Sequence, residues 1–227
     1  MRPVSARTAP RVVELLVIRH GQSQWNALGR GHGWGDPPLS RLGEAQAVAA
    51  ATALARQRLD AGVVASDLRR ARQTAELVAA PLGIGPVTTM AELREHHIGD
   101  WDGRTWEEIE VDWPGAKAAW VAEGLERPPG GESSDEFRTR VWRAISAIVR
   151  LRQRGRVLVV AHGGVVRALE RMSGERPQPV AFLSGRWFVW GGGRLRAGSG
   201  FLAEAPSGRD FEPTGQGGES HRPGEPG

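Results

Sequence analysis

The stretch VVELLVIRHGQSQWN, residues 12–26, decides the fold, because an apolar run changes abruptly into a polar one. Residues 12–18 are apolar and rich in branched side chains apart from Glu14, a composition typical of a buried strand. Arg19 and His20 follow directly, and Gly21 begins a loop. A buried strand that ends in charged residues and glycine predicts an α/β protein with polar groups at one edge of its sheet.

Strand and helix signals alternate along most of the remaining chain. Strands are predicted at residues 63–66 and 156–161, each followed by a helix, the second of which is opened by Gly163. Ser133 and Glu136 make a capping box ahead of another helix. This alternation predicts a three-layer α/β/α fold with a mostly parallel central sheet. Three helices are predicted from apolar residues at helical spacing. The first is capped by Ser40 and has Leu42, Ala45, Ala49 and Thr52 on its apolar face. The second is capped by Ser66 or Asp67, is ended by Pro81, and has Leu68, Ala71, Ala75 and Val78 on that face, while the third follows Ser133 and has Phe137, Val141, Ile145 and Ile148.

Three segments depart from this alternation. Residues 100–131 are rich in tryptophan and proline, and we interpret them as an excursion over the sheet with a short helix boxed by Thr105 and Glu108. Residues 187–195 contain a run of glycines between apolar residues and predict a β-hairpin. Residues 204–227 are rich in Gly, Pro and Ser and are predicted to be disordered. We therefore expect one domain over residues 1–203.

Composition excludes several classes of function. The 227 residues include no cysteine, so thiolate nucleophiles, disulfides and cysteine-ligated metals are ruled out. No segment has the apolar length of a signal-peptide core or a membrane span, and we expect a cytoplasmic protein with no membrane partner. The formal charge is +4 and Lys117 is the single lysine, so the positive charge is nearly all arginine. These arginines are interleaved with acids, which argues against nucleic-acid binding.

Four polar clusters fall where the predicted strands end. They are RHGQS with Asn26 at residues 19–26, SDLRRA at 66–71, LRE at 93–95 and AHGG at 161–164. Ligands bind at the carboxyl ends of strands in open α/β sheets, so we expect the clusters to form one site.

These side chains match what a phosphomonoester requires if it is cleaved without a metal. Its oxygens need planar cationic donors and helix-terminal amides, its phosphorus needs a nucleophile, and its leaving oxygen needs a proton. Neutral His20 is the candidate nucleophile, and Glu95 is the candidate general acid and base. His162 is a further donor in this catalytic set. The phosphate-binding candidates are Arg19, Asn26, Arg70 and the amide of Gly163.

Five motifs occur in order between Leu16 and Val166: RHGQSQWN, SDLRRARQTA, ELREHHIGDWDG, PPGGES and VVAHGG. In these motifs the chain resembles the histidine phosphatase superfamily, also called phosphoglycerate mutase-like. The resemblance implies a parallel-rich sheet with an antiparallel edge strand, a phosphoryl group carried by His20, and no metal or organic cofactor. It selects Arg70 among neighbouring arginines and matches Glu95 to the proton donor. Family members often form dimers, so a homodimer is left open, and Asp102 stands where the family turn usually has glutamate.

Other interpretations of the histidines exist. One histidine after a strand is often a structural residue, but two His-Gly pairs flanked by arginine and glutamate are hard to explain as packing. His96 and His97 could join His20 and His162 in a metal cluster. Adjacent side chains of an extended segment point to opposite faces, however, so we expect no metal.

Phosphatases and mutases of this family share the phosphate-binding and catalytic residues, so only their loops can distinguish the two activities. Mutases resemble the chain around Gln22, Ser23 and Asn26, but they have a longer insertion after the glutamate and a tyrosine beside it. This chain has no tyrosine, and its loop at residues 29–35 is expected to be flexible rather than sealing. We expect a phosphohistidine phosphatase acting on a small metabolite, either a sugar phosphate or a phosphoglycerate derivative. The alternative is a cofactor-dependent phosphoglycerate mutase. Candidates for further substrate contacts are Gln22, Ser23 and Arg94.

Overall fold

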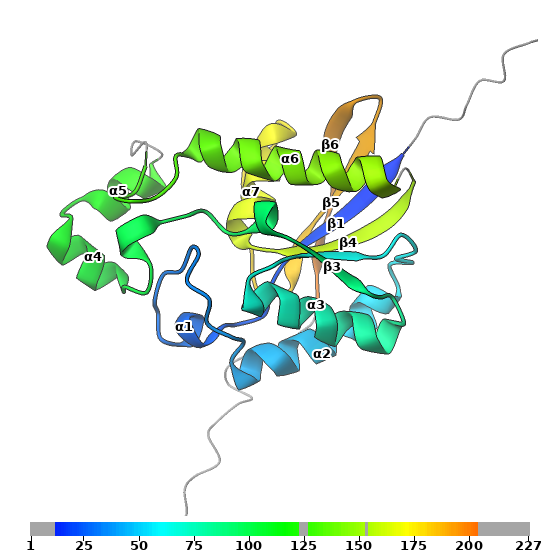
Figure 1. The fold of residues 1–227 in the computed structure, drawn as a ribbon, viewed down its shortest axis with the longest axis horizontal. Helices are drawn as coiled ribbons and strands as arrows, with labels where there is room; N and C mark the ends of the chain where they lie inside the picture. Colours follow the sequence, from blue (N-terminus) through cyan, green and yellow to red (C-terminus); the bar gives the residue numbers. More distant parts are fainter. Residues whose placement is uncertain (1–11, 123–126, 153, 204–227) are drawn as a thin grey trace, which may run out of the picture.

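A six-stranded sheet forms the centre of the computed structural model, which describes residues 12–122, 127–152 and 154–203 (Figure 1). The strand order is β3–β2–β4–β1–β5–β6. The strands are β1 (Val13–Arg19), β2 (Val63–Ser66), β3 (Val87–Met90), β4 (Gly155–Ala161), β5 (Ser184–Gly191) and β6 (Arg194–Leu202). The strands predicted at 12–18, 63–66 and 156–161 are therefore confirmed. The tail 204–227, predicted to be disordered, lies outside the described residues.

The sheet is parallel on one side of β1 and antiparallel on the other. β1 pairs in parallel with β4, β4 with β2, and β2 with β3. β5 runs antiparallel to β1 and forms a hairpin with β6. The predicted hairpin is thus the same element as the antiparallel edge that the family resemblance implies, and both are confirmed.

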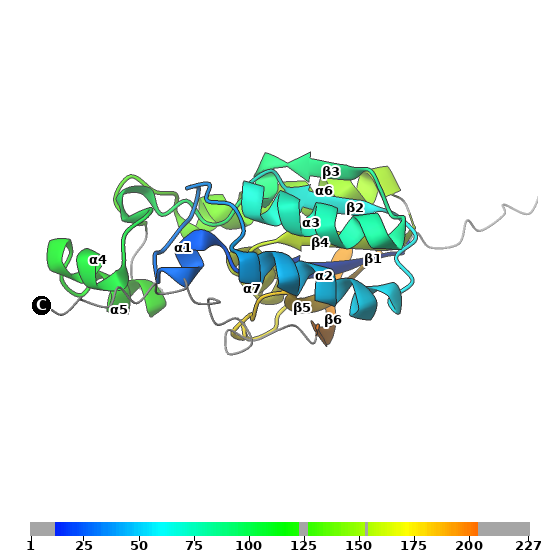
Figure 2. The ribbon, with the colours of Figure 1, turned by 90° about the horizontal axis from the view of Figure 1, so that it is seen from below.

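Helices cover both faces of the sheet, as predicted (Figure 2). Successive side chains of a strand point to opposite faces, so β1 contributes to two cores. Leu15 and Val17 pack with helices α6 (Ser134–Arg152) and α7 (Gly163–Met172). Leu16 and Ile18 pack on the other face with α2 (Arg41–Ala55) and α3 (Arg69–Leu82).

Helix α6 begins and packs as the sequence predicts. The Ser133 hydroxyl accepts a hydrogen bond from the Glu136 amide at 3.1 Å, and the Glu136 carboxylate accepts one from the Ser133 amide at 2.8 Å. The predicted apolar face is buried along the whole helix, with Phe137, Val141, Ile145 and Ile148 at most 5% exposed.

Helix α2 is capped by Ser40 as predicted, but its buried face differs from the predicted one. Thr52 of the predicted face is exposed, and the others are only partly buried. Alanine lies on every side of this helix, so its periodicity is ambiguous. The contact at Gly43 decides the orientation, because a Cβ there would lie 2.0 Å from the Gln22 carbonyl oxygen. The buried residues are Gly43, Gln46, Ala47, Ala50, Ala51 and Leu54.

Helix α3 buries its predicted face, but both of its ends differ from the prediction. Leu68 occupies the N-cap position in an extended conformation and makes no side-chain cap, so neither Ser66 nor Asp67 caps the helix. Pro81 lies inside the last turn, and the helix continues to Leu82.

The predicted excursion, residues 100–131, lies beyond the carboxyl ends of the strands, with its helices on the left in Figure 1. Two 3-10 turns, η1 (Ala91–Leu93) and η2 (Gly99–Trp101), lead from β3 into it, and it holds helices α4 (Trp106–Asp112) and α5 (Ala116–Val121). The predicted Thr105–Glu108 capping box is confirmed. Trp101 is fully buried, with the rings of Trp106, Trp113 and Trp120 packed around it. Across the described ranges, no helix combines the length and apolar character needed to cross a membrane.

Candidate active site

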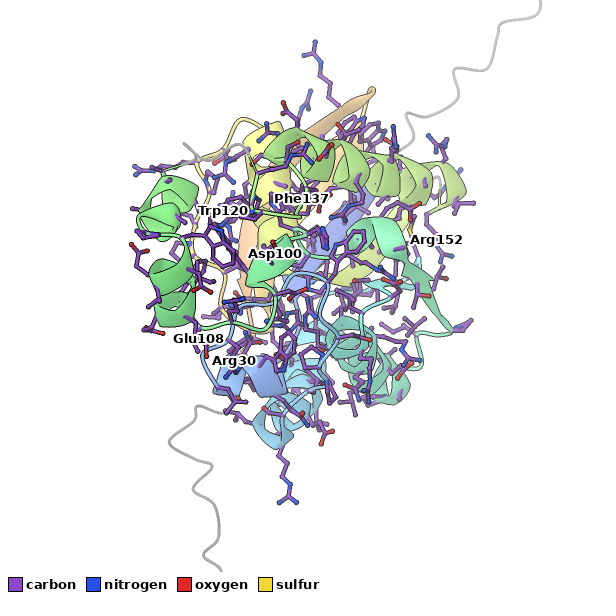
Figure 3. The ribbon with its side chains drawn as sticks, turned by 60° about the vertical axis from the view of Figure 1, so that its left-hand side comes forward. Arg30, Asp100, Glu108, Trp120, Phe137 and Arg152 are labelled. Atoms are coloured by element: carbon purple, nitrogen blue, oxygen red, sulfur yellow. The ribbon has the colours of Figure 1, made fainter. Side chains whose placement is uncertain are left out.

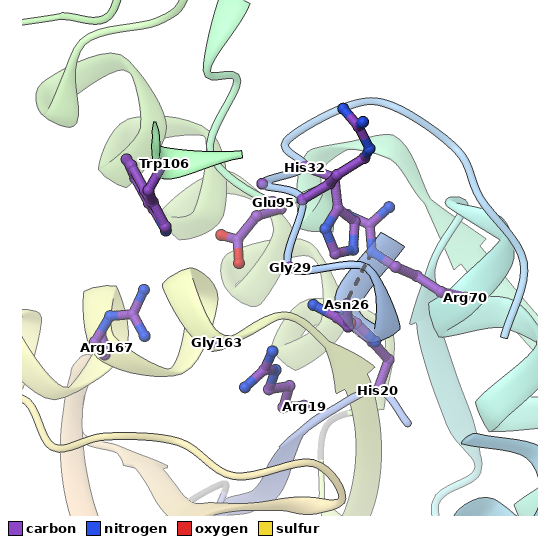
Figure 4. Close-up of a pocket in the computed structure, with 12 residues that line it drawn as sticks. Arg19, His20, Asn26, Gly29, His32, Arg70, Glu95, Trp106, Gly163 and Arg167 are labelled. Carbon is purple, nitrogen blue, oxygen red and sulfur yellow. Dashed lines mark hydrogen bonds between the residues drawn. The ribbon is translucent and has the colours of Figure 1, made fainter. Parts of the chain in front are cut away.

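A cavity of about 400 Å³ lies where the four polar clusters meet (Figure 4). His20 follows β1, Arg70 is in the first turn of α3, Glu95 follows η1, and Gly163 begins α7. We call this cavity the phosphate pocket. Its lining residues are Arg19, His20, Asn26, Gly29, Arg30, Gly31, His32, Arg70, Glu95, Trp106, Gly163 and Arg167.

His20 presents one ring nitrogen as a base. Its Nδ1 lies 2.6 Å from the Gly21 carbonyl oxygen, which can only accept, so Nδ1 carries the proton. Nε2 keeps its lone pair and accepts a hydrogen bond from Arg70 Nε at 3.2 Å, drawn dashed in Figure 4. Burial, reinforced by Arg70 and Arg19, holds the pKa of His20 well below its ordinary value. The imidazole is therefore neutral and nucleophilic at Nε2.

His162 brings a second buried imidazole to the same place. Its ring centroid lies 5.1 Å from that of His20, and its side chain is fully buried as the N-cap residue of α7. Neither ring nitrogen has a hydrogen-bond partner among the described residues. Burial, reinforced by Arg70, holds the pKa of His162 well below its ordinary value. Unpaired buried polar atoms are costly, which favours a bound group that pairs with them.

Arg19 and Arg70 are buried cations whose guanidinium groups are stabilised by hydrogen bonds to backbone carbonyls. Arg70 is fully buried, and it donates from its terminal nitrogens to the carbonyls of Gly35 at 2.8 Å and Gly33 at 2.9 Å. Arg19 donates to the Val180 carbonyl at 2.8 Å. Burial lowers the pKa of each arginine to about 10, so both remain charged at neutral pH. Two guanidinium groups beside neutral imidazoles are suited to a tetrahedral oxyanion.

The Glu95 carboxylate is fixed at the start of α7. It accepts hydrogen bonds from the Gly164 amide at 3.0 Å and from the His96 amide at 2.9 Å. Glycine is required at position 164, because a Cβ there would lie 1.9 Å from a Glu95 carboxylate oxygen. The segment that carries Glu95 is held in turn by Arg140, which donates to the carbonyls of Arg94 at 2.9 Å and Glu95 at 3.1 Å.

The loop at residues 29–35, expected to be flexible, is clamped instead. The Asp102 carboxylate accepts the amides of Gly33 at 2.9 Å, Trp34 at 3.0 Å and Gly35 at 2.6 Å. The expectation was wrong because it considered glycine content alone, whereas the acceptor lies far away in the sequence. Since Gly33 and Gly35 hold Arg70, this clamp also fixes the donor to His20.

Some of the predicted substrate contacts lie elsewhere. Arg94 makes a bidentate pair with Asp67, at 2.8 and 2.6 Å, and is not among the lining residues. The Gln22 side chain accepts from the Ser40 hydroxyl at 2.8 Å. Ser23 caps α1 (Gln24–Ala27) together with Asn26, and Asn26 alone of these two lines the pocket.

Sequence reasoning did not identify His32 and Arg167 as pocket residues. His32 lies within the clamped loop, and burial together with Arg70 lowers its pKa to about 3. Arg167 lies one turn into α7 and faces the pocket in Figure 4. Its spacing of four residues from Gly163 on a predicted helix was the available signal, because residues four apart lie on one helix face.

The two adjacent histidines do diverge, as expected for neighbours on an extended segment. His96 packs between Trp120 and Phe137, with both ring centroids at 4.7 Å. His97 lies against Trp34 at 4.5 Å. Within the described part of the chain, no three His, Asp or Glu side chains are arranged to hold a metal ion.

The fold and the pocket together define an α/β protein with buried imidazoles and guanidinium groups gathered at the carboxyl edge of its sheet. The chain belongs to the histidine phosphatase superfamily, branch 1, whose family model matches residues 15–179.

The relatives carry names of phosphatases and of a mutase. The chain is 38% identical over 160 residues to a metal-independent phosphoserine phosphatase of Arabidopsis thaliana, covering 70% of this chain and 67% of that one. It is 40% identical over 166 residues to a glucosyl-3-phosphoglycerate phosphatase of Mycolicibacterium vanbaalenii, covering 70% and 73%. A 2,3-bisphosphoglycerate-dependent phosphoglycerate mutase of Methylobacterium radiotolerans is 38% identical over 161 residues, covering 68% and 76%.

The crystal structure of a mycobacterial glucosyl-3-phosphoglycerate phosphatase has the same fold. It superimposes with a TM-score of 0.71 at 33% identity, covering 82% of this chain and 97% of that one.

Proposed function

We propose that this protein is a metal-independent phosphomonoester hydrolase in which His20 carries the phosphoryl group. The proposal rests on the protonation state and the position of the His20 imidazole. Its one proton is donated to Gly21, its Nε2 lone pair faces a cavity with two arginines, and its pKa is lowered by burial. A neutral imidazole in such a place is a nucleophile rather than a cation.

In the first step, Nε2 of His20 attacks phosphorus and the bond from phosphorus to the leaving oxygen breaks. Arg70 Nε lies beside Nε2, so it can transfer its hydrogen bond to a phosphoryl oxygen as the new bond forms. Arg19 and His162 donate to the remaining oxygens and stabilise their negative charge. The leaving oxygen takes a proton from the carboxyl group of Glu95.

In the second step, water attacks phosphorus and the bond from phosphorus to Nε2 breaks. The Glu95 carboxylate, held by two amides, accepts the proton from this water. Inorganic phosphate leaves, and both His20 and Glu95 return to their starting states.

The second candidate is a phosphoglycerate mutase, favoured by the 38% identity to a mutase. A mutase has to keep water away from the phosphohistidine while its substrate reorients. With 3-phosphoglycerate and catalytic 2,3-bisphosphoglycerate, we expect phosphate release to be faster than formation of 2-phosphoglycerate. Tenfold faster isomerisation in an enolase-coupled assay would establish the mutase instead.

The test of the phosphohistidine is to quench the enzyme during turnover of a radiolabelled substrate. The label should be stable in alkali, labile in acid, and located on His20. It should be lost in His20→Asn and retained in His97→Asn, whose position is outside the pocket. Turnover should also be unaffected by EDTA. A label on serine or aspartate, or inactivation by EDTA, would overturn the proposal.

A further inference from the structure

A second and larger cavity, of about 560 Å³, adjoins the phosphate pocket. The two cavities share Gly31, His32, Glu95, Trp106 and Arg167. Because Glu95 is the proposed proton donor to the leaving oxygen, whatever departs from phosphorus on that side lies in the second cavity. We call it the leaving-group cavity.

One wall of the leaving-group cavity is apolar and partly aromatic. Ile98, Trp120 and Phe137 line it. Phe137 belongs to the core and stacks on His96, and Trp120 makes an edge contact with the same imidazole. Figure 3 shows Trp120 on α5 and Phe137 on α6, at the end of the molecule where the excursion lies. A wall of this kind gains free energy when it covers a ring or another apolar body.

Arg167 stands where the two cavities join. It forms no hydrogen bond or ion pair with any described residue, whereas Arg138 of the same cavity is paired with Asp135. Its positive charge also lowers the pKa of Arg19, after the larger effect of burial, so the two cations repel. A partly buried arginine that repels its neighbour and lacks an acceptor is suited to an anionic group.

We propose that the leaving-group cavity selects phosphomonoesters whose leaving group combines a ring or comparable apolar body with a second negative charge. The apolar body packs on Ile98, Trp120 and Phe137, and the charge pairs with Arg167. A small uncharged leaving group would leave the wall and the guanidinium in contact with water. This inference rests on the proposed phosphatase function and names the substrate class of that site.

The test uses three synthetic substrates with similar alkyl leaving oxygens: ethyl phosphate, benzyl phosphate and 4-carboxybenzyl phosphate. For the wild-type enzyme, kcat/KM should rise about tenfold from ethyl to benzyl. It should rise about tenfold again when the carboxylate is added. Equal kcat/KM for all three, with a phosphohistidine still formed, would overturn the inference alone. Failure to hydrolyse any of them, with no phosphohistidine, would overturn the proposed function.

Variants distinguish the contact with the apolar wall from the contact with Arg167. For each variant, the ratio of kcat/KM between two substrates is compared with the same ratio for the wild-type enzyme. Arg167→Met should remove the gain from the carboxylate and keep the gain from the ring. Trp120→Leu should lower the ring gain, and Ile98→Ala provides the same test with a smaller side chain and outside the excursion. Arg194→Met, in the exposed part of the β5–β6 hairpin, should keep both ratios. If Arg167→Met slowed all three substrates by the same factor, Arg167 would be a phosphate contact and the proposal would be wrong.

Discussion

The phosphate pocket and the leaving-group cavity are adjacent, but they are built in different ways. The pocket takes His20, Arg70 and His162 from the ends of paired strands or from the first turn of the next helix. The cavity takes Ile98 from the segment before η2, Trp120 from the excursion and Phe137 from α6. None of these three residues belongs to a strand of the sheet. The sheet thus fixes the reacting groups, while the irregular segments are free to change the choice of substrate.

This difference leads to a testable expectation for substitutions in the two cavities. A change in the phosphate pocket should affect every phosphomonoester, because every substrate presents the same phosphoryl group. A change in the leaving-group cavity should act according to the leaving group.

The largest effect is expected at His20. His20→Asn removes the nucleophile, and kcat should fall by at least about 10³-fold for all substrates. The measurement is steady-state hydrolysis of ethyl, benzyl and p-nitrophenyl phosphate. Residual activity that differed widely among the three would show that another group can replace His20 for some of them.

The effect of replacing Glu95 should depend on how strongly the leaving oxygen of a substrate needs a proton, and not on the shape of the leaving group. Glu95→Gln removes the transferable proton, so kcat for ethyl phosphate should fall roughly 10²- to 10⁴-fold. The first step for p-nitrophenyl phosphate should be affected much less, because nitrophenolate departs without a proton. Pre-steady-state kinetics can isolate that step. Equal losses of the first step for both substrates would assign Glu95 a positioning role only.

Asp102 acts at a distance, through the clamped loop and Arg70. Asparagine offers only one acceptor oxygen in place of two, so Asp102→Asn should break at least one of the three amide contacts. We expect kcat/KM to fall about tenfold for all substrates, with a matching loss of vanadate affinity. Asp102→Glu, the residue usual in the family, should restore part of both.

Asp100→Asn is the matched control for Asp102→Asn, because Asp100 is an exposed residue of η2 and Asp102 is the C-cap residue of the same turn. It should change neither kcat/KM nor vanadate affinity. If Asp102→Asn altered only benzyl substrates, the clamp would belong to the leaving-group cavity.

The same division explains how much could be predicted from the sequence. Arg19, His20, Glu95 and His162 were found because each lies in a polar cluster at the end of a predicted strand, whereas the family resemblance selected Arg70 among its neighbouring arginines. The Asp102 contacts were not found, because they join residues 67 to 69 positions apart in segments without periodicity.

Arg94 shows the converse error. Its place beside Glu95 suggested a substrate contact, yet Asp67 at the end of the neighbouring strand β2 takes its guanidinium. Local pattern identifies which residues reach the carboxyl edge of the sheet. It does not identify which of them pair with each other there.

The smallest effect concerns stability in acid and involves the buried histidines around the phosphate pocket. The pKa values of His20, His32 and His162 all lie below the ordinary value of 6.5, chiefly because of burial. Below pH 6.5 the unfolded chain therefore binds protons that the folded protein does not. The stabilising contribution is complete above pH 6.5 and is lost as the pH falls below it, down to about pH 3 for His32. Each histidine costs at most about 1.4 kcal/mol per pH unit.

His32→Gln should reduce the fall in unfolding free energy between pH 6.5 and pH 5 by up to about 1.4 kcal/mol per pH unit, as measured by urea denaturation. Vanadate should reduce the acid loss in the wild-type protein, since an anion beside the imidazoles raises their pKa in the folded state and stabilises that state directly. If His32→Gln lost stability in acid as steeply as the wild-type protein, His32 would not be a neutral buried imidazole.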